Sequence, residues 1–251
     1  MSGGEIALVA LAGLAAGTIN TVVGSGTLIT FPVLLAFGYA PVTANVTNTV
    51  GLVPGSMSGA WGYRRELAGQ RQRAARLGAA SVLGGITGAV LLLVLPASAF
   101  AAIVPAFIAI ALVLTVLQPR LNAWLLRRRG RGRGEGGALT ALAIYATGVY
   151  GGYFGAAQGI LLLGVLGVAL AQDLQRTNAL KNVLAGLVNG VAAVYFAFAA
   201  QVEWAPAAII ACASIAGGQL GARYGRRLEP RPLRALIVVV GSVAIVRLLS
   251  M

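Results

Sequence analysis

The sequence predicts an all-α, polytopic membrane protein with about ten membrane segments in two inverted five-segment repeats, and with short or broken helices near the midplane. Hydrophobic residues make up 58% of the 251 residues, charged residues only 10%, and the mean hydropathy is +0.86. This composition is too apolar for one soluble core. Residues 81–89 (SVLGGITGA) recur as residues 214–222 (SIAGGQLGA) at an offset of 133. An uncharged turn follows the first copy and an arginine-rich turn follows the second, so we expect one repeat to be upside down relative to the other.

Five apolar segments are expected in the first half, at about residues 5–23, 27–38, 42–63, 74–95 and 99–117. The first residues lack the basic start and the cleavage site of a signal peptide, so we expect the first segment to stay in the membrane. The second segment is too short to cross a hydrocarbon core of about 30 Å, because a helix rises about 1.5 Å per residue. It follows a glycine cluster at residues 24–27 (GSGT), where the chain is expected to break.

The second half is expected to repeat this order, with segments at about residues 138–154, 158–171, 174–200, 205–222 and 232–250. Its second segment is again short and again follows a glycine cluster, at residues 151–155 (GGYFG). Short, glycine-interrupted segments at matching positions are typical of a transport site between two halves. We therefore divide the chain into a first membrane repeat (residues 1–118), a basic cytoplasmic linker (residues 119–137) and a second, inverted membrane repeat (residues 138–251).

The positive charge of the chain predicts its orientation in the membrane. The net charge is +13, and 16 of the 19 basic residues lie within residues 64–76, 120–133 and 223–234. The positive-inside rule places these loops in the cytoplasm of a bacterial-type cell with the protein in the inner membrane, and the parity of the crossings then places both termini outside. The arginine tract at residues 127–133 could instead bind RNA or anionic lipid. We favour the topological role, and expect the bilayer, with anionic lipids at the basic loops, but no nucleic acid, as a partner.

The ionisable residues exclude most enzymatic functions. The chain has no histidine, and its six carboxylates lie in or beside predicted loops or at a segment end. It has one cysteine, Cys212, which we expect to be a small core residue. Neither a metal site, a catalytic pair, a disulfide within the chain nor a cofactor site is expected. An intramembrane enzyme acting on lipid phosphates would need an acid or a histidine that the sequence lacks.

Small polar residues inside the apolar segments predict a binding site. Unsatisfied amides and hydroxyls are costly in hydrocarbon, so such residues must face a bundle interior or water. Hydrogen bonding between helices is the alternative for each of them, and Lys181, the only lysine, could instead extend to the interface. The candidate substrate-binding residues are Asn20, Gly24, Ser25, Gly26, Thr27, Asn45, Asn48, Gln158, Asn178, Lys181 and Asn182.

The chemistry of these groups favours a small anion as the substrate. If the chain unwinds at residues 24–27 and starts a helix near Pro32, backbone N–H groups with partial positive charge become available, and anions bind readily to such groups. A cation would find no acid nearby. A non-transporting membrane scaffold or accessory subunit, in which the repeat serves helix packing alone, is the alternative. Neither reading predicts an oligomeric state.

Three sequence stretches resemble the first repeat of the TauE/SafE sulfite exporter family: residues 17–28 (GTINTVVGSGTL), 31–35 (FPVLL) and 44–49 (ANVTNT). Residues 176–182 (RTNALKN) resemble the matching part of the second repeat. The resemblance implies an inner-membrane carrier of small anions such as sulfite, sulfonates or sulfoacetate. Where the family usually has a run like Gly-Gly-Gly, this chain has residues 24–27 (GSGT), and the second break reads GAAQG at residues 155–159. We therefore expect an asymmetric site in which Gln158 replaces a backbone donor.

Overall fold

The chain folds entirely into helices over the residues that the structure describes. The computed structural model describes residues 1–127, 137–225 and 230–249. Within these ranges it contains ten α-helices and no strand, which confirms the all-α prediction. The helices are α1 (Gly3–Val22), α2 (Thr27–Ala36), α3 (Pro41–Gly62), α4 (Arg71–Val94), α5 (Ala97–Arg127), α6 (Ala138–Tyr153), α7 (Gln158–Ala169), α8 (Leu174–Ala199), α9 (Trp204–Tyr224) and α10 (Pro230–Leu249).

Several of these helices can cross a bilayer. In the described part of the chain, α1, α4, α5, α8 and α9 are each long and apolar enough to do so. Helix α3 has 22 residues, but it carries the polar sequence at residues 44–49 that lowers its hydropathy. Many large apolar side chains also face outward, including Leu11, Leu139 and Phe198, which are 63%, 80% and 90% exposed. The chain is a multi-pass membrane protein, because lipid is the solvent that such a surface needs.

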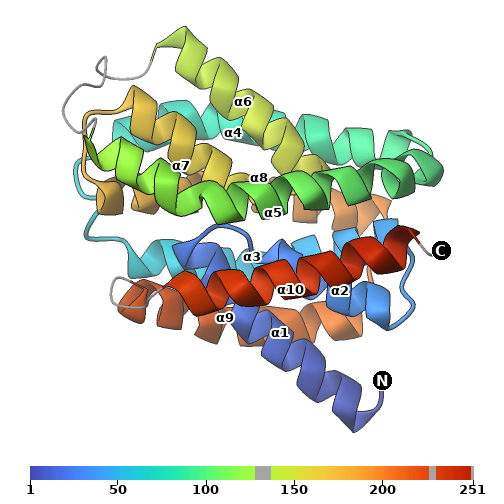
Figure 1. Ribbon diagram of the computed structural model, residues 1–251. Coiled ribbons are helices and arrows are strands. Elements are labelled where there is room, and N and C mark those ends of the chain that lie inside the picture. Colours follow the sequence, from blue (N-terminus) through green and yellow to red (C-terminus); the bar gives the residue numbers. More distant parts are fainter. Residues whose placement is uncertain (128–136, 226–229, 250–251) are drawn as a thin grey trace.

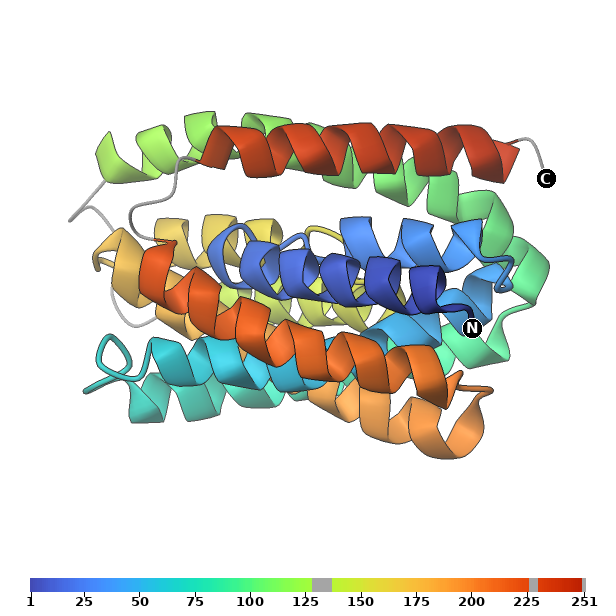
Figure 2. The ribbon, with the colours of Figure 1, turned by 90° about the horizontal axis from the view of Figure 1, so that it is seen from below.

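The two short helices form hairpins with the helices that precede them. Helices α2 and α7 have 10 and 12 residues. As Figures 1 and 2 show, α2 runs back toward the end of the molecule at which α1 begins, and α7 runs back toward the opposite end, at which α6 begins. The turns at residues 23–26 and 156–159 are buried. The two hairpins therefore enter the bundle from opposite ends, and each turns back inside it.

The recurring glycine motif forms the main helix–helix interfaces. Helix α4 packs on α6, and α9 packs on α1. A Cβ atom at Gly84 would lie 2.2 Å from the carbonyl oxygen of Tyr145, and one at Gly217 would lie 2.2 Å from that of Leu14. Small residues let helix backbones approach closely in lipid. Each copy of the motif thus holds the first helix of the other half of the chain.

Helices α5 and α10 lie side by side and cover the hairpins, as the upper edge of Figure 2 shows. Helix α5 contacts α7, and α10 contacts α2. Helix α5 continues past the expected end of its segment, through Pro119 to Arg127, so the first part of the expected basic linker is helical. The rest of that linker, at residues 128–136, lies outside the described residues, as do residues 226–229 of the last basic turn.

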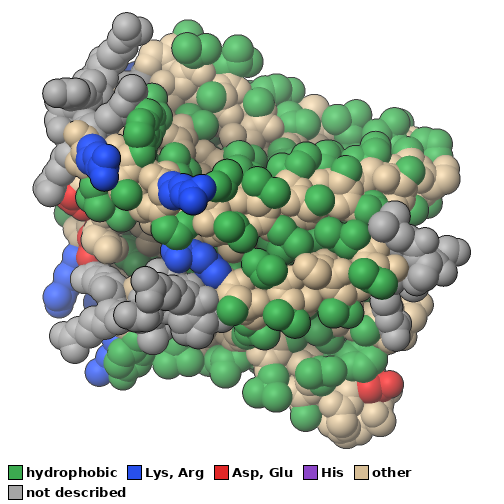
Figure 3. All heavy atoms as spheres, viewed as in Figure 1, with side chains coloured by type: hydrophobic (Ala, Val, Ile, Leu, Met, Phe, Trp, Pro, Cys, Tyr) green, Lys and Arg blue, Asp and Glu red, His purple; other side chains and the backbone are tan. Residues whose placement is uncertain are grey.

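Charge is distributed unevenly between the two ends of the bundle. On the face shown in Figure 3, the Lys and Arg side chains lie in the left half of the view. Arg71 at the start of α4, Arg127 at the end of α5 and Arg223 near the end of α9 belong to this basic end. The start of α1 and the end of α10 lie at the opposite end (Figure 1).

Two expectations from the sequence are wrong. Helix α2 begins at Thr27, so Pro32 lies inside the helix and not in its first turn. The turn that contains Gly24 and Gly26 is complete before α2 begins. Pro32 has no N–H group to donate to the preceding turn of the helix, and neighbouring helices bury this part of the backbone. Cys212 is exposed and is not a core residue. Helix α9 turns its buried Ser214 and Gly217 toward α1 and α3, which leaves Cys212 on the outer surface.

Candidate functional site

The ends of α1 and α6 share one capping pattern, although the second break also contains Ala157, a non-glycine residue with a φ angle of +59°. Gly24 and Gly155 have φ angles of +90° and +78°, a conformation that glycine adopts at little cost. The N–H groups of residues 23 and 24 both donate to the carbonyl of Ile19, and those of residues 154 and 155 both donate to the carbonyl of Tyr150. This arrangement is a glycine C-cap, which ends a helix and reverses the chain.

The two breaks meet through their backbones. The N–H group of Gly159 donates to the carbonyl oxygen of Gly24 at 3.2 Å. A Cβ atom at Gly24 would lie 2.5 Å from the Cα atom of Gly159, so no larger residue fits without a shift. Gly26, another candidate residue, packs against α1, since its Cβ would lie 2.4 Å from the carbonyl oxygen of Ala16. The glycine clusters that the sequence singled out therefore place two hairpin turns in direct contact.

Lys181 lies beside this contact and binds the end of α1. Its Nζ donates to the carbonyl oxygens of Asn20 and Thr21, at 3.2 Å each. The last carbonyls of a helix lack partners within it and form the negative end of the helix dipole, which a positive group stabilises. Lys181 is only 1% exposed, so its side chain does not extend to the interface.

Two amides support the same helix end. The Nδ2 atoms of Asn178 and Asn182 donate to the carbonyl oxygen of Thr21 at 3.3 and 3.4 Å. A small cavity adjoins them, with a volume of about 10 Å³ and lined by residues that include Asn20, Gly24, Lys181 and Asn182, which leaves room for about one water molecule. Among the described residues that line it there is no carboxylate. The structure therefore brings four of the other candidate residues together around the buried amine of Lys181.

The other candidate residues make separate contacts. Asn48 accepts a hydrogen bond from Thr30 and donates to Thr27 Oγ1 at 3.3 Å, which ties α3 to the start of α2. Asn45 Nδ2 donates to the carbonyl oxygen of Tyr153 at 3.0 Å. These bonds join helices, so the geometry at Asn45 and Asn48 fits the alternative in which these residues serve hydrogen bonding between helices.

Ser25 and Gln158 also lie away from the small cavity. The hydroxyl of Ser25 lies 3.4 Å from that of Thr115 on α5. Gln158 lies against Gly151 of α6, and its Nε2 donor has no hydrogen-bond partner although the side chain is 97% buried. Gln158 therefore keeps an unused donor inside the bundle, on the α6 side of the meeting point.

Ser56 and Asn189 belong to the site although neither was among the candidates. Ser56 Oγ accepts hydrogen bonds from Asn20 Nδ2 at 3.2 Å and from Asn189 Nδ2 at 3.4 Å. The signal that could have revealed them is a spacing: polar residues stand at positions 45, 48, 49 and 56 of α3 and at positions 178, 181, 182 and 189 of α8. Steps of three, four and seven keep one face of a helix, and the two sets differ by the same offset of 133.

Aromatic rings close the bundle between this centre and the end opposite the arginines. The ring of Phe154 packs against Phe31 of α2, with centroids 5.3 Å apart, and against Phe100 and Phe107 of α5 at 6.0 and 6.1 Å. Helix α5 begins at that end (Figure 1). Edge-to-face and offset contacts at these distances are favourable, and Phe31, Phe100 and Phe154 are buried, so the rings form an apolar layer beside the hairpin turns.

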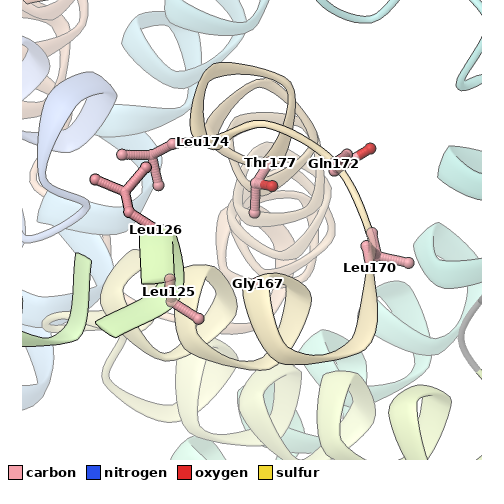
Figure 4. Close-up of a pocket in the computed structure, with 7 residues that line it drawn as sticks. All are labelled: Leu125, Leu126, Gly167, Leu170, Gln172, Leu174 and Thr177. Carbon is pink, nitrogen blue, oxygen red and sulfur yellow. The ribbon is translucent and has the colours of Figure 1, made fainter. Parts of the chain in front are cut away.

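The basic side of the bundle is more open. A cavity of about 20 Å³ lies between the ends of α5 and α7 and the start of α8 (Figure 4). Its lining is mostly leucine, and its Thr177 hydroxyl donates to the carbonyl of Asp173 within α8. This cavity contains none of the candidate residues. A second cavity, of about 120 Å³, does reach one of them, Asn178.

The fold and its apolar surface define a multi-pass helical membrane protein with a buried polar centre. The family model described as "Sulfite exporter TauE/SafE" matches residues 9–248. The chain therefore belongs to the TauE/SafE family of membrane transporters, as the sequence resemblance indicated.

Two curated relatives support this assignment. The chain is 26% identical over 235 residues to "Probable membrane transporter protein YfcA" of Escherichia coli (strain K12), covering 93% of this chain and 86% of that protein. It is 27% identical over 247 residues to "Probable membrane transporter protein ORF9" of Sinorhizobium sp, covering 98% and 92%. No solved structure matches the chain.

Proposed function

We propose that this protein carries a small anion, such as sulfite, a sulfonate or a related organic anion, across the inner membrane. The observation that carries the proposal is Lys181, a buried amine with three neighbouring amides at the meeting point of two hairpin turns. A charged group inside a membrane protein is costly and marks a functional site by default. Since no carboxylate lines the described part of the cavity, an anion is the ligand that this charge favours.

The carbonyls of Asn20 and Thr21 hold the amine in place until the anion arrives. The full negative charge of an anion attracts an ammonium group more strongly than the partial negative charge of a carbonyl oxygen does. An anion that enters the cavity therefore competes with the two carbonyls for the Nζ donors. Asn178 and Asn182 remain bound to α1 and keep the helix end from moving while the lysine changes partners.

We infer that residues 1–118 and 138–251 are inverted repeats joined by the basic linker at residues 119–137. The exchanged helix contacts support this inference, since α1 packs on α9 as α6 packs on α4, and α2 contacts α10 as α7 contacts α5. In a bilayer, the α1–α2 and α6–α7 hairpins would then be re-entrant and would meet near the midplane. Non-helical backbone is tolerated at that depth where protein buries it.

The arginine-rich end is the cytoplasmic side in this proposal, and both termini are outside. Anionic lipid headgroups would then surround that end. The aromatic layer closes the path to the outside, so the state described here receives its anion from the cytoplasm. A cytoplasm-negative potential favours export of the anion by about 2.3 kcal/mol per charge per 100 mV.

Most of the buried amides already bond to other helices, and this observation favours the alternative function, a non-transporting scaffold. Anion flux from proteoliposomes separates the two functions. We expect the reconstituted protein to release sulfite or ethanesulfonate faster than empty vesicles, and Lys181→Met to lower that flux at least tenfold while the protein elutes and melts like wild type. The matched control is Arg223→Ala, which removes an exposed charge at the basic end of the bundle. A folded wild-type protein without flux for any anion would favour the scaffold.

A further inference from the structure

A groove between α6 and α7 opens on the outer surface of the bundle. Its volume is about 680 Å³, which lies within the range of ligand pockets, about 300–1,000 Å³. No charged residue is among its described lining residues. The lining comes from both helices and includes Leu139, Thr140, Ala143, Gly164, Val165 and Val168. None of these is a candidate residue of the central site, so the groove is a separate feature of the molecule.

The groove faces hydrocarbon. Leu139 and Val168 at its edges are 80% and 50% exposed, and a lipid environment is the one in which such exposed apolar side chains are stable. A Cβ atom added at Gly164 would meet nothing closer than Leu121, at 3.6 Å, so the glycine leaves open space. The bilayer supplies flexible acyl chains that fit a space of this kind.

Arginines flank the groove at one end. Helix α6 begins and α7 ends at the arginine-rich end of the bundle (Figure 1). Helix α4 packs on α6 and begins at Arg71, and α5 contacts α7 and ends at Arg127. Both side chains are exposed, and neither makes a hydrogen bond or an ion pair with another described residue. The carboxylate that follows α7, Asp173, is engaged in capping α8, where it accepts the N–H group of Arg176 at 2.8 Å.

We propose that the groove binds one anionic phospholipid, with an acyl chain between α6 and α7 and the phosphate group at the arginine-rich end. The chain alone gives little preference over bulk lipid, because lipid tails are as apolar as the side chains of the groove. The headgroup charge supplies the preference, since each arginine near a membrane surface strengthens the binding of an anionic lipid about fivefold.

A second copy of the chain is the other occupant that an apolar groove accepts. Two copies with the same orientation would place their arginine-rich ends side by side in one leaflet, where like charges repel. An anionic lipid instead brings the opposite charge to that end. The charge around the groove therefore favours the lipid.

A matched pair of lipids tests the groove. Phosphatidylglycerol and phosphatidylcholine with the same acyl chains differ in headgroup charge, and native mass spectrometry of the detergent-purified full-length protein counts the bound molecules of each. We expect one phosphatidylglycerol to bind at least about tenfold more tightly than phosphatidylcholine. Ala143→Phe and Val168→Phe, which fill the groove from its two sides, should each remove this preference. The control Ala216→Phe, at an exposed position of α9, should keep it.

Charge variants and a free phosphate complete the test. Arg71→Gln and Arg127→Gln should each weaken phosphatidylglycerol binding about fivefold, whereas Arg223→Gln near the end of α9 should leave it unchanged. Glycerol 3-phosphate, which has no acyl chain, should not compete with the lipid. Competition by this free phosphate would overturn the proposal, as would equal binding of the two lipids by wild type or a preference that persists in both groove variants. A wild-type dimer that Ala143→Phe dissociates would assign the groove to a second copy and overturn it too. None of these outcomes depends on anion flux, so the transport proposal stands or fails separately.

Discussion

Gly159 and Gly24 show how closely two hairpin turns approach when neither residue has a side chain. A methyl group at position 159 would lie 2.5 Å from the Cα atom of Gly24, and backbone cannot move aside as a flexible side chain can. We expect Gly159→Ala to lower the free energy of unfolding by about 1–3 kcal/mol, as overpacking does in other cores. Thermal unfolding in detergent, followed by tryptophan fluorescence, measures the change.

Gly190 provides the control for that substitution. It lies in α8, as a helical glycine with nothing within 4 Å of its Cβ position. Gly190→Ala should be neutral or should stabilise the protein by up to about 1 kcal/mol, because alanine loses less backbone entropy in a helix. Equal stability changes in the two variants would show that the hairpin turns are not in contact.

At the scale of the helices, the two copies of the glycine motif should contribute similar stability. The α4–α6 and α1–α9 interfaces share no helix, and the Cβ positions of Gly84 and Gly217 both lie 2.2 Å from a facing carbonyl oxygen. We expect Gly84→Ala and Gly217→Ala each to destabilise the protein by about 2–3 kcal/mol. The double variant should equal the sum within about 0.5 kcal/mol, because independent sites are additive.

The stability changes of these two single variants also test whether the two halves of the chain are equivalent. Gly164→Ala in α7, whose Cβ would meet only Leu121 at an ordinary 3.6 Å, should change stability little. If one of the two motif variants melted like wild type while the other was strongly destabilised, the two interfaces would not be equivalent, and the proposed inversion of the halves would lose its main support.

The sequence predicted these elements better than it predicted the polar contacts between them. Glycine clusters revealed both hairpin turns because only glycine combines a positive φ with so close an approach. The hydrogen bond between Ser56 and Asn189, and the one from Gln118 to the carbonyl oxygen of Val23, depend instead on how the helices cross, which no local pattern specifies. For the same reason Lys181 was found as a residue, but its partners at the end of α1 were not.

At the scale of the whole molecule, charge and packing divide the bundle in the same direction. The described arginines at the ends of α4, α5 and α9 occupy one end, and the aromatic layer around Phe154 occupies the side toward the other end. In the proposed transport, an anion that enters from the basic end reaches Lys181 before it meets the aromatic layer. The direction of transport therefore depends on which end faces the cytoplasm.

Reporter fusions determine that orientation. Alkaline phosphatase is active only outside the cytoplasm, whereas green fluorescent protein folds to its fluorescent form in the cytoplasm. We expect a phosphatase fused after residue 251 to be active and a fluorescent protein fused there to be dark, since α10 ends away from the arginines (Figure 1). Inserted within residues 128–136, the two reporters should behave in the opposite way, because basic loops stay in the cytoplasm. A fluorescent C-terminal fusion would contradict this orientation: the aromatic layer would then face the cytoplasm, and the proposed site would receive its anion from outside, as an importer requires.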